Sequence, residues 1–220
     1  MNTRCTAVIF DMDGLMLDTE SIARRASIKA ASDLGYRIPD SLFIQLVGLN
    51  INGSTAILET ELGKDFPTAV FFKKMHDYED LHINQHGIPV KPGLVELINM
   101  LDQRSIAKGI GTSTKKLKAV EKLKIAGLRD SFEHIVGGDE VKEGKPAPHL
   151  FLKVAERLGA NPANCLVLED SEPGIRAAHF AGMMPVMIPD LKQPSPEIKK
   201  LAYRVFPSLF EAKELISTLI

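Results

Sequence analysis

Short apolar runs alternate with amphipathic stretches over most of this chain. The runs predict buried strands, at residues 6–10, 106–111, 134–136, 165–168 and 185–188. Apolar positions with a helical period predict helices near residues 94–101, 117–125, 148–158, 175–181 and 209–219. Strands that alternate with helices indicate an α/β fold, in which a parallel sheet is connected by right-handed crossovers.

Residues 19–85 interrupt this alternation, because they contain no convincing strand. Their apolar spacing predicts helices at residues 21–34, 40–46, 54–62 and 67–85. This segment is too long for one crossover helix. We therefore expect a helical insert at 19–85 and a sheet-containing unit made of 1–18 and 86–220. The Pro- and Lys-containing run at 189–196 is predicted to be a surface loop.

Composition narrows the class of protein. The 220 residues carry a formal net charge of −1, so no basic surplus favours nucleic acid or an anionic membrane as a partner. Cys5 and Cys165 lie in or beside apolar runs, which is typical of small buried hydrophobes and not of a disulfide framework. No apolar run has the length of a membrane span, and the N-terminus has no signal-like segment. We expect a soluble cytoplasmic protein that is a monomer or weak dimer.

Polar side chains stand at comparable places along the predicted sheet. They are Asp11 and Asp13 after the first strand, Thr112 and Ser113 after the second, Lys145 at the start of the helix that follows a glycine pair at 137–138, and Glu169 and Asp170 after the strand at 165–168. Taken singly, each has an ordinary explanation as a solvated turn, a helix N-cap or a surface lysine. If the strands are parallel neighbours, however, all of these residues meet at one edge of the sheet.

Such a set has the chemistry that phosphoryl transfer needs. A carboxylate can attack phosphorus once Mg²⁺ and a lysine offset the repulsion between the two anions. Hydroxyl and backbone N–H groups can hold the phosphoryl oxygens, and a second carboxylate can move the proton. Lys115 and Lys116 lie beside this set, although a solvated helix start is their ordinary role. The six histidines show no metal-ligand spacing tied to it.

Four motifs, in order along nearly the whole chain, resemble those of haloacid dehalogenase superfamily phosphatases. They are residues 11–19 (DMDGLMLDT), Thr112, residues 145–148 (KPAP) and residues 169–174 (EDSEPG). The branch with the closest resemblance includes β-phosphoglucomutase and small sugar-phosphate phosphatases. The resemblance implies a Rossmann-like core with an inserted all-helical cap.

The resemblance also implies site roles. Asp11 would be the nucleophile and Asp13 the acid/base. Mg²⁺ would be held by Asp11, the Asp13 carbonyl and Asp170, with Glu169 assisting. Thr112 and Lys145 complete the expected catalytic set, and the expected phosphate or substrate contacts are Gly14, Thr112, Ser113, Lys115 and Lys116.

The activity predicted in this way is Mg²⁺-dependent hydrolysis of a small phosphate ester, namely a sugar, polyol or nucleotide monophosphate. A phosphomutase of the β-phosphoglucomutase type is the alternative. Where that mutase has an arginine and a histidine in its cap, this chain has Ile51 and Ala23, which favours hydrolysis. Dehalogenases lack the second aspartate of the first motif, so Asp13 argues against that chemistry. A non-catalytic receiver module is more distant, because receivers have no helical insert after the first strand.

Overall fold

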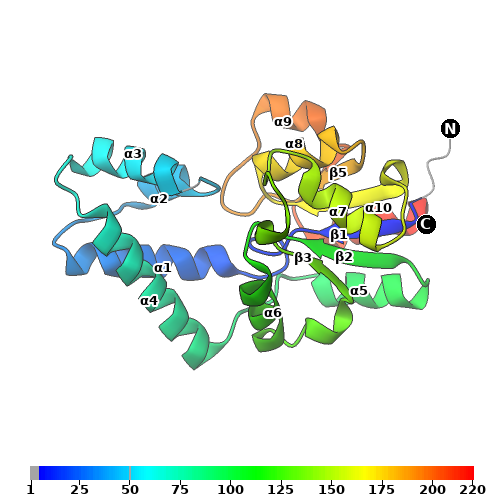
Figure 1. Cartoon of the computed structure of the whole chain (residues 1–220), viewed down its shortest axis with the longest axis horizontal. Coiled ribbons are helices and arrows are strands. Elements are labelled where there is room, and N and C mark those ends of the chain that lie inside the picture. The colour runs from blue at the N-terminus through cyan, green and yellow to red at the C-terminus, as the bar shows by residue number, and fades with distance from the viewer. Residues whose placement is uncertain (1–4, 50) are drawn as a thin grey trace. The chain divides into compact units, whose positions relative to one another are not determined.

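The computed structural model describes residues 5–49 and 51–220, which form two compact units (Figure 1). One unit comprises the described part of Met1–Leu17 together with Pro89–Ile220, and the other is Asp18–Ile88. The joints predicted from the sequence lie between residues 18 and 19 and between residues 85 and 86, within three residues of these divisions. The first unit, which we call the sheet unit, contains all the candidate site residues, although the last two residues of the motif at 11–19 fall in the second. We call Asp18–Ile88 the helical unit.

The sheet unit is built on a parallel sheet whose described strands have the order β3-β2-β1-β4-β5-β6. They are β1 (Ala7–Phe10), β2 (Ala107–Gly111), β3 (His134–Val136), β4 (Cys165–Glu169), β5 (Met184–Met187) and β6 (Arg204–Val205). Ala7 of β1 pairs with Ala107 of β2 on one side and with Cys165 of β4 on the other. The chain therefore runs outward in one direction from β1 to β3 and in the other from β4 to β6. The switch of direction between β1 and β4 is where ligands bind in open α/β sheets.

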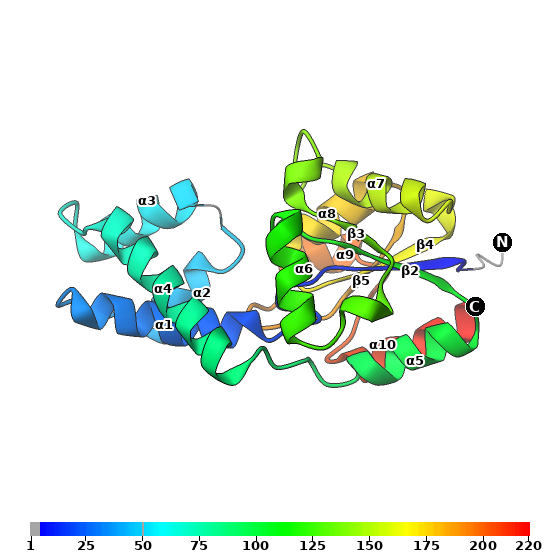
Figure 2. The same ribbon diagram turned by 60° about the horizontal axis from the view of Figure 1, so that its bottom comes forward.

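Helices cover both faces of the sheet. They are α5 (Leu94–Gln103), α6 (Lys116–Ile125), α7 (His149–Arg157), α8 (Glu172–Phe180), α9 (Pro196–Leu201) and α10 (Leu209–Leu219), with short 3₁₀ turns η1 (Arg129–Ser131), η2 (Gly138–Glu140) and η3 (Pro162–Asn164). Figure 2 shows α7 and α8 on one face and α5 and α10 on the other. Ile9 and Val167 pack with Phe151 and Val154 of α7 in one buried cluster. Burial on both faces explains why the central strands are continuously apolar.

The helical unit contains α1 (Thr19–Asp33), α2 (Asp40–Leu46), α3 (Ile51–Leu62) and α4 (Thr68–His86). Helices α1 and α4 make the most extensive contact in this unit. Its core includes Ala30 of α1, Leu58 of α3 and Phe71 of α4, each fully buried. The Phe71 ring lies 5.3 Å from that of Phe66, which stacks edge-on against Tyr36. In the part of the chain that the structure describes, no helix is long and apolar enough to cross a bilayer.

The predicted fold class is confirmed, and each predicted strand is present within one residue at either end. The two-residue strand β6 and helix α9 were not predicted. The loop expected at 189–196 ends at Ser195, because the Ser195 hydroxyl caps the Ile198 N–H and Pro196 begins α9. Helix α8 begins at Glu172, three residues before its predicted start, because the Ser171 side chain caps it. Cys5 and Cys165 are buried and unbridged, as predicted.

Candidate active site

The turn after β1 carries Asp11 to the switch point of the sheet. The Asp11 N–H donates to the Leu168 carbonyl of β4 at 3.0 Å, so the residue continues the sheet's hydrogen bonding. Its side chain is only 8% exposed. Gly14 then takes a φ of +85°, a conformation that residues with a Cβ rarely adopt. Its N–H donates to the Leu17 carbonyl at 2.9 Å and closes the turn.

Lys145 joins two carboxylates that come from neighbouring strands. Its ammonium donates both to Asp11 Oδ1 and to Glu169 Oε1. The Lys145 side chain is 6% exposed and that of Glu169 is fully buried. The prediction that Lys145 stands at the start of a helix is wrong. Lys145 lies in the loop before α7, which begins at His149, and this loop lets it reach the sheet edge.

Glu169 fits into a cradle at the start of α8. Its Oε2 accepts hydrogen bonds from the Ser171 N–H at 2.7 Å and from the Ser171 hydroxyl at 2.8 Å. Gly174 leaves room for this carboxylate, because a Cβ there would stand 1.8 Å from Glu169 Oε1. With Lys145 on Oε1 and Ser171 on Oε2, the Glu169 carboxylate is held from both sides.

Burial and charge work against each other in this cluster. Burial raises the pKa of the Asp11 carboxyl above its ordinary value, Lys145 opposes that rise, and Glu169 adds to it. Burial alone would lower the pKa of Lys145, but Asp11 and Glu169 outweigh it and the net shift is upward. Lys145 therefore stays protonated, and Asp11 depends on nearby positive charge to remain ionised.

Asp13 lies in a second hydrogen-bonded group beside the first. Its Oδ2 accepts from the Thr114 hydroxyl at 2.7 Å and lies 3.5 Å from the Thr112 hydroxyl. Its Oδ1 contacts the Lys122 ammonium of α6 at 2.5 Å. Thr112 is 1% exposed and also accepts from the Thr114 N–H at 3.1 Å. The loop after β2 therefore supplies hydroxyl groups to the turn after β1.

Asp170 lies against the turn that holds Asp11 and Asp13. A Cβ built on Gly14 would come within 2.3 Å of Asp170 Oδ2, so the glycine leaves space that the carboxylate fills. Among the described residues, no three Asp, Glu, His or Cys side chains are grouped as a metal site. Mg²⁺ needs no such group, since it usually takes one or two carboxylates and keeps several waters. Asp11 and Asp170, the carboxylates at this turn, have the oxygen chemistry that a hydrated Mg²⁺ takes, and the Glu169 carboxylate is hydrogen-bonded to Lys145 and Ser171.

The other expected substrate contacts are not all drawn into the site. Ser113 and Lys115 are exposed. Lys116 donates to the Ile135 carbonyl and lies 3.7 Å from Glu140 Oε2, which directs its ammonium to the end of β3. In this structure Lys116 is thus a support for the loop. Its predicted phosphate contact would require it to leave these partners.

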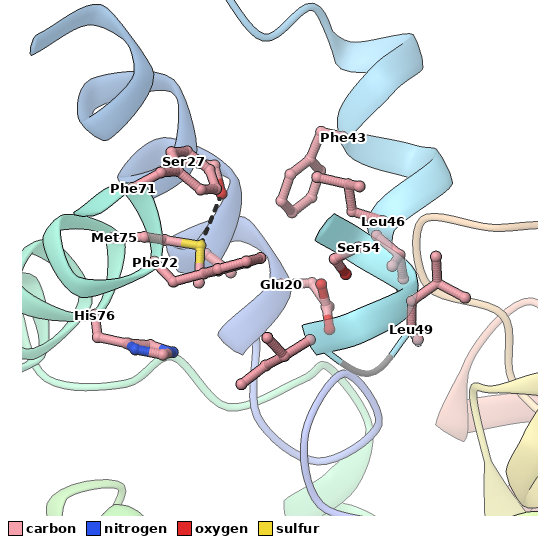
Figure 3. Close-up of a pocket in the computed structure, with 14 residues that line it drawn as sticks. Glu20, Ser27, Phe43, Leu46, Leu49, Ser54, Phe71, Phe72, Met75 and His76 are labelled. Atoms are coloured by element: carbon pink, nitrogen blue, oxygen red, sulfur yellow. Dashed lines mark hydrogen bonds between the residues drawn. The ribbon is translucent and has the colours of Figure 1, made fainter. Parts of the chain in front are cut away.

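A separate cavity of about 240 Å³ lies within the helical unit. Its walls are mainly apolar and include aromatic rings and a methionine from α2 and α4 (Figure 3). The lining residues are Glu20, Ala23, Ser27, Phe43, Leu46, Val47, Gly48, Leu49, Ile51, Ser54, Phe71, Phe72, Met75 and His76. Ala23 and Ile51, the two positions at which the mutase pattern is broken, both line it. Among these residues there is no lysine or arginine.

Two residues that contact Asp13, Thr114 and Lys122, were not predicted from the sequence. Thr114 is not among the residues predicted from the sequence, although its spacing of two from Thr112 is compatible with a shared face. Lys122 is one of several lysines on α6. No sequence signal separates it from the others, because its contact with Asp13 depends on how α6 packs.

Comparisons with known proteins agree with this geometry. A family model described as "Haloacid dehalogenase-like hydrolase" matches residues 8–188. The "Phosphorylated carbohydrates phosphatase" of Thermotoga maritima is 33% identical over 177 residues, covering 80% of this chain and 82% of its own. The fructose-1-phosphate phosphatase of Escherichia coli is 34% identical, covering 83% of this chain and 96% of its own.

A solved structure extends the likeness to the fold. The β-phosphoglucomutase of Clostridium difficile aligns with a TM-score of 0.76 and 27% identity, covering 98% of this chain and 96% of that one. The family match spans most of the chain, and each of the two phosphatases is identical to it at about one aligned residue in three. The chain therefore belongs to the haloacid dehalogenase-like hydrolase family and is a phosphoric monoester hydrolase.

Proposed function

We propose that this enzyme is a Mg²⁺-dependent phosphatase that hydrolyses a small sugar or polyol monophosphate through an aspartyl-phosphate on Asp11. The observation that carries the proposal is the buried contact of Asp11 with Lys145 at the carboxyl end of β1. A carboxylate held there, next to a fixed ammonium, is suited to attack a phosphorus atom. Asp13 lies two residues further along the same turn, in reach of the leaving oxygen.

In the first step the Asp11 carboxylate attacks phosphorus, and the bond between phosphorus and the leaving oxygen breaks. Asp13 gives a proton to that oxygen, so that the product leaves as a neutral alcohol. The ammonium of Lys145 offsets the negative charge that gathers around Asp11 and the phosphoryl oxygens. The Thr112 hydroxyl and the backbone N–H groups of the two loops supply donors to those oxygens.

In the second step water attacks phosphorus and the bond to Asp11 breaks. Asp13, now ionised, takes a proton from the water, and inorganic phosphate leaves. Asp11 returns as a carboxylate and Asp13 as an acid. Glu169 takes no proton in this scheme, since its role is to hold Lys145 in place.

Asp11, Asp170 and the Asp13 carbonyl would hold the metal ion. When bound, Mg²⁺ supplies positive charge that lets one anion approach another. Oxygen ligands favour Mg²⁺ over Zn²⁺. Gly14 supports this assignment, because its missing Cβ leaves the Asp170 carboxylate against the turn.

The cavity of the helical unit supports a substrate with one phosphate. Its described lining has Glu20, His76 and two serines but no guanidinium or ammonium to hold a second phosphate. A mutase needs such an anchor to hold its bisphosphate intermediate while the intermediate reorients in the site. The relatives named for phosphorylated carbohydrates and fructose 1-phosphate support a sugar or polyol ester. The β-phosphoglucomutase fold keeps the mutase as the second candidate.

The helical unit is further proposed to act as a cap. It is inserted directly after the nucleophile turn, with joints near residues 17–20 and 88–93. A closing cap would exclude bulk water and complete the substrate pocket. The apolar lining around Phe43, Phe72 and Met75 would then favour the carbon face of a sugar or a longer apolar group.

A panel of sugar, polyol and nucleotide monophosphates, with inorganic phosphate measured, tests the proposal. We expect Mg²⁺-dependent release from at least one sugar or polyol ester, and none from the Asp11→Asn variant as matched control. A coupled assay follows β-glucose 1-phosphate to glucose 6-phosphate with the bisphosphate as primer. Isomerisation faster than phosphate release would reverse the choice in favour of the mutase.

A further inference from the structure

Lys122 makes a contact that the proposed mechanism does not use. Its ammonium lies 2.5 Å from Asp13 Oδ1, and the two side chains are 16% and 24% exposed. Lys122 stands in the last turn of α6. Side chains of a helix lean toward its N-terminus, so Lys122 reaches back toward the loops that follow β1 and β2. In this direction the Lys122 ammonium reaches Asp13 from the side of the loop that follows β2.

The other oxygen of Asp13 is held from the same side. Thr114 donates its hydroxyl to Oδ2 at 2.7 Å. Thr114 is itself fixed, because its N–H donates to the Thr112 hydroxyl at 3.1 Å and its carbonyl accepts from the Gly138 N–H at 3.1 Å. One carboxylate oxygen is thus set by a rigid loop and the other by Lys122.

We propose that Lys122 is a positioning residue for proton transfer, which acts by holding the Asp13 carboxylate in one orientation together with Thr114. This inference rests on the proposed function, since it assumes that Asp13 moves the proton. A short carboxylate side chain that is partly exposed can occupy several rotamers, and few of them face the leaving oxygen. With a donor on each of its two oxygens, the Asp13 carboxylate keeps a single rotamer. A misplacement of about 1 Å at such a group can cost on the order of 10²-fold in rate.

The neighbouring lysine provides a matched control. Lys124 lies on the same helix, in the same last turn, and is exposed. Replacing either lysine with methionine removes one positive charge from the same end of α6. Only Lys122→Met takes a donor from Asp13, so a difference between the two variants reports that contact and not the charge of the helix.

Two substrates separate positioning of the acid from a general loss of structure. An alkyl monophosphate, such as glycerol phosphate or an accepted sugar phosphate, needs a proton on its leaving oxygen. The nitrophenolate of p-nitrophenyl phosphate leaves without one. For Lys122→Met we expect kcat/KM to fall about 10- to 100-fold on the alkyl ester and by less than about threefold on the nitrophenyl ester. Lys124→Met should match wild type on both.

A double-mutant cycle with Asp13→Asn completes the test. If Lys122 acts through Asp13, adding Lys122→Met to Asp13→Asn should change kcat/KM no further. Lys122→Arg should recover most of the lost activity, and Thr114→Val, on the other oxygen, should give the same dependence on the leaving group.

Equal losses on both esters, or an undiminished Lys122→Met effect in the Asp13→Asn background, would overturn the role of Lys122 and leave the phosphatase intact. Failure of wild type to release phosphate from either ester would overturn the proposed function itself.

Discussion

Replacing Lys145 with methionine should destabilise the sheet unit, and the loss should depend on pH. The Lys145 ammonium contacts Asp11 and Glu169, and the three side chains are 6%, 8% and 0% exposed. The ammonium also lies 5.0 Å from the centre of the Phe151 ring, and methionine keeps much of the length and the apolar stem of the lysine side chain. The substitution therefore removes mainly the charge, and leaves two buried carboxylates without their shared cation.

The magnitude follows from this burial. Removing one partner of a buried ion pair costs about 3–5 kcal/mol, because the remaining charge stays desolvated. For a domain of this size, 1 kcal/mol shifts the melting temperature by roughly 2–4 °C. We therefore expect the melting temperature of Lys145→Met to fall by about 6–20 °C at neutral pH. Whole-protein stabilities are about 5–15 kcal/mol, so the variant still folds if the wild type is not at the bottom of that range.

The sign of the pH dependence comes from Asp11. Burial raises the pKa of this carboxyl, and Lys145 opposes the rise, so the native pKa of Asp11 climbs further in the variant. The native pKa of Asp11 lies above its value in the unfolded chain, which is about 3.9. The protein therefore has the full stability from this group only below the unfolded pKa. The stability is lost as pH rises through the native pKa. The deficit of Lys145→Met should thus be small near pH 5 and largest near pH 8.

Urea unfolding, followed by circular dichroism between pH 5 and pH 8 in excess chelator, measures this deficit. Lys142 is an exposed lysine in the same loop, so Lys142→Met serves as the control and should show no loss of stability. Adding Asp11→Asn to Lys145→Met should recover part of the loss. If the deficit is the same at pH 5 and pH 8, the cost arises from packing and the electrostatic reasoning is wrong.

Other expectations concern single groups. Asp11→Asn should lower phosphate release by more than about 10³-fold, because an amide cannot act as the nucleophile, while its melting temperature holds or rises. Chelation should abolish phosphate release and added Mg²⁺ should restore it; full activity in excess chelator would contradict the metal site. Gly174→Ala should cost about 1–3 kcal/mol in urea unfolding, since its Cβ would stand 1.8 Å from Glu169 Oε1. The hydrogen bond from Arg157 lowers the pKa of Glu140 to about 2. The stability that this contact adds is present above pH of about 4.3 and lost as pH falls toward 2, so wild type and Glu140→Gln should converge in acid.

The sequence predicted the fold where a residue's neighbours in the chain decide its structure. Central strands such as β1 and β4 are buried on both faces, so their apolar runs stand out. Strand β6 consists of the exposed Arg204 and Val205. Two residues have no periodicity, and only pairing with β5 makes them a strand. The early start of α8 follows from the Ser171 cap and the proline at the start of the helix, which are both signals that the sequence carries.

The residues of the candidate site also differ in how well the sequence predicts them. Asp11 and Asp13 follow β1 and Glu169 ends β4, so the parallel order of the strands brings them to one edge, and the loop before α7 adds Lys145. Lys116 was expected beside the phosphate, but the packing of α6 takes its ammonium to the Ile135 carbonyl. The same packing takes the neighbouring Lys122 to Asp13. Which lysine of a helix reaches a site is decided by how the helix rotates against the sheet, and the sequence carries no direct record of that angle.

The central place of β1 has a consequence for synthesis of the protein. Ala7 pairs with Ala107 and with Cys165, so the first strand made must wait for both of its partners. At a translation rate of about 5–20 residues per second, β1 stays unpaired for several seconds at least. The helical unit is complete in the nascent chain before either partner strand appears, and its local contacts form fast. During this interval the wholly apolar strand β1 has no sheet partner, so it is the part of the growing chain most prone to wrong association.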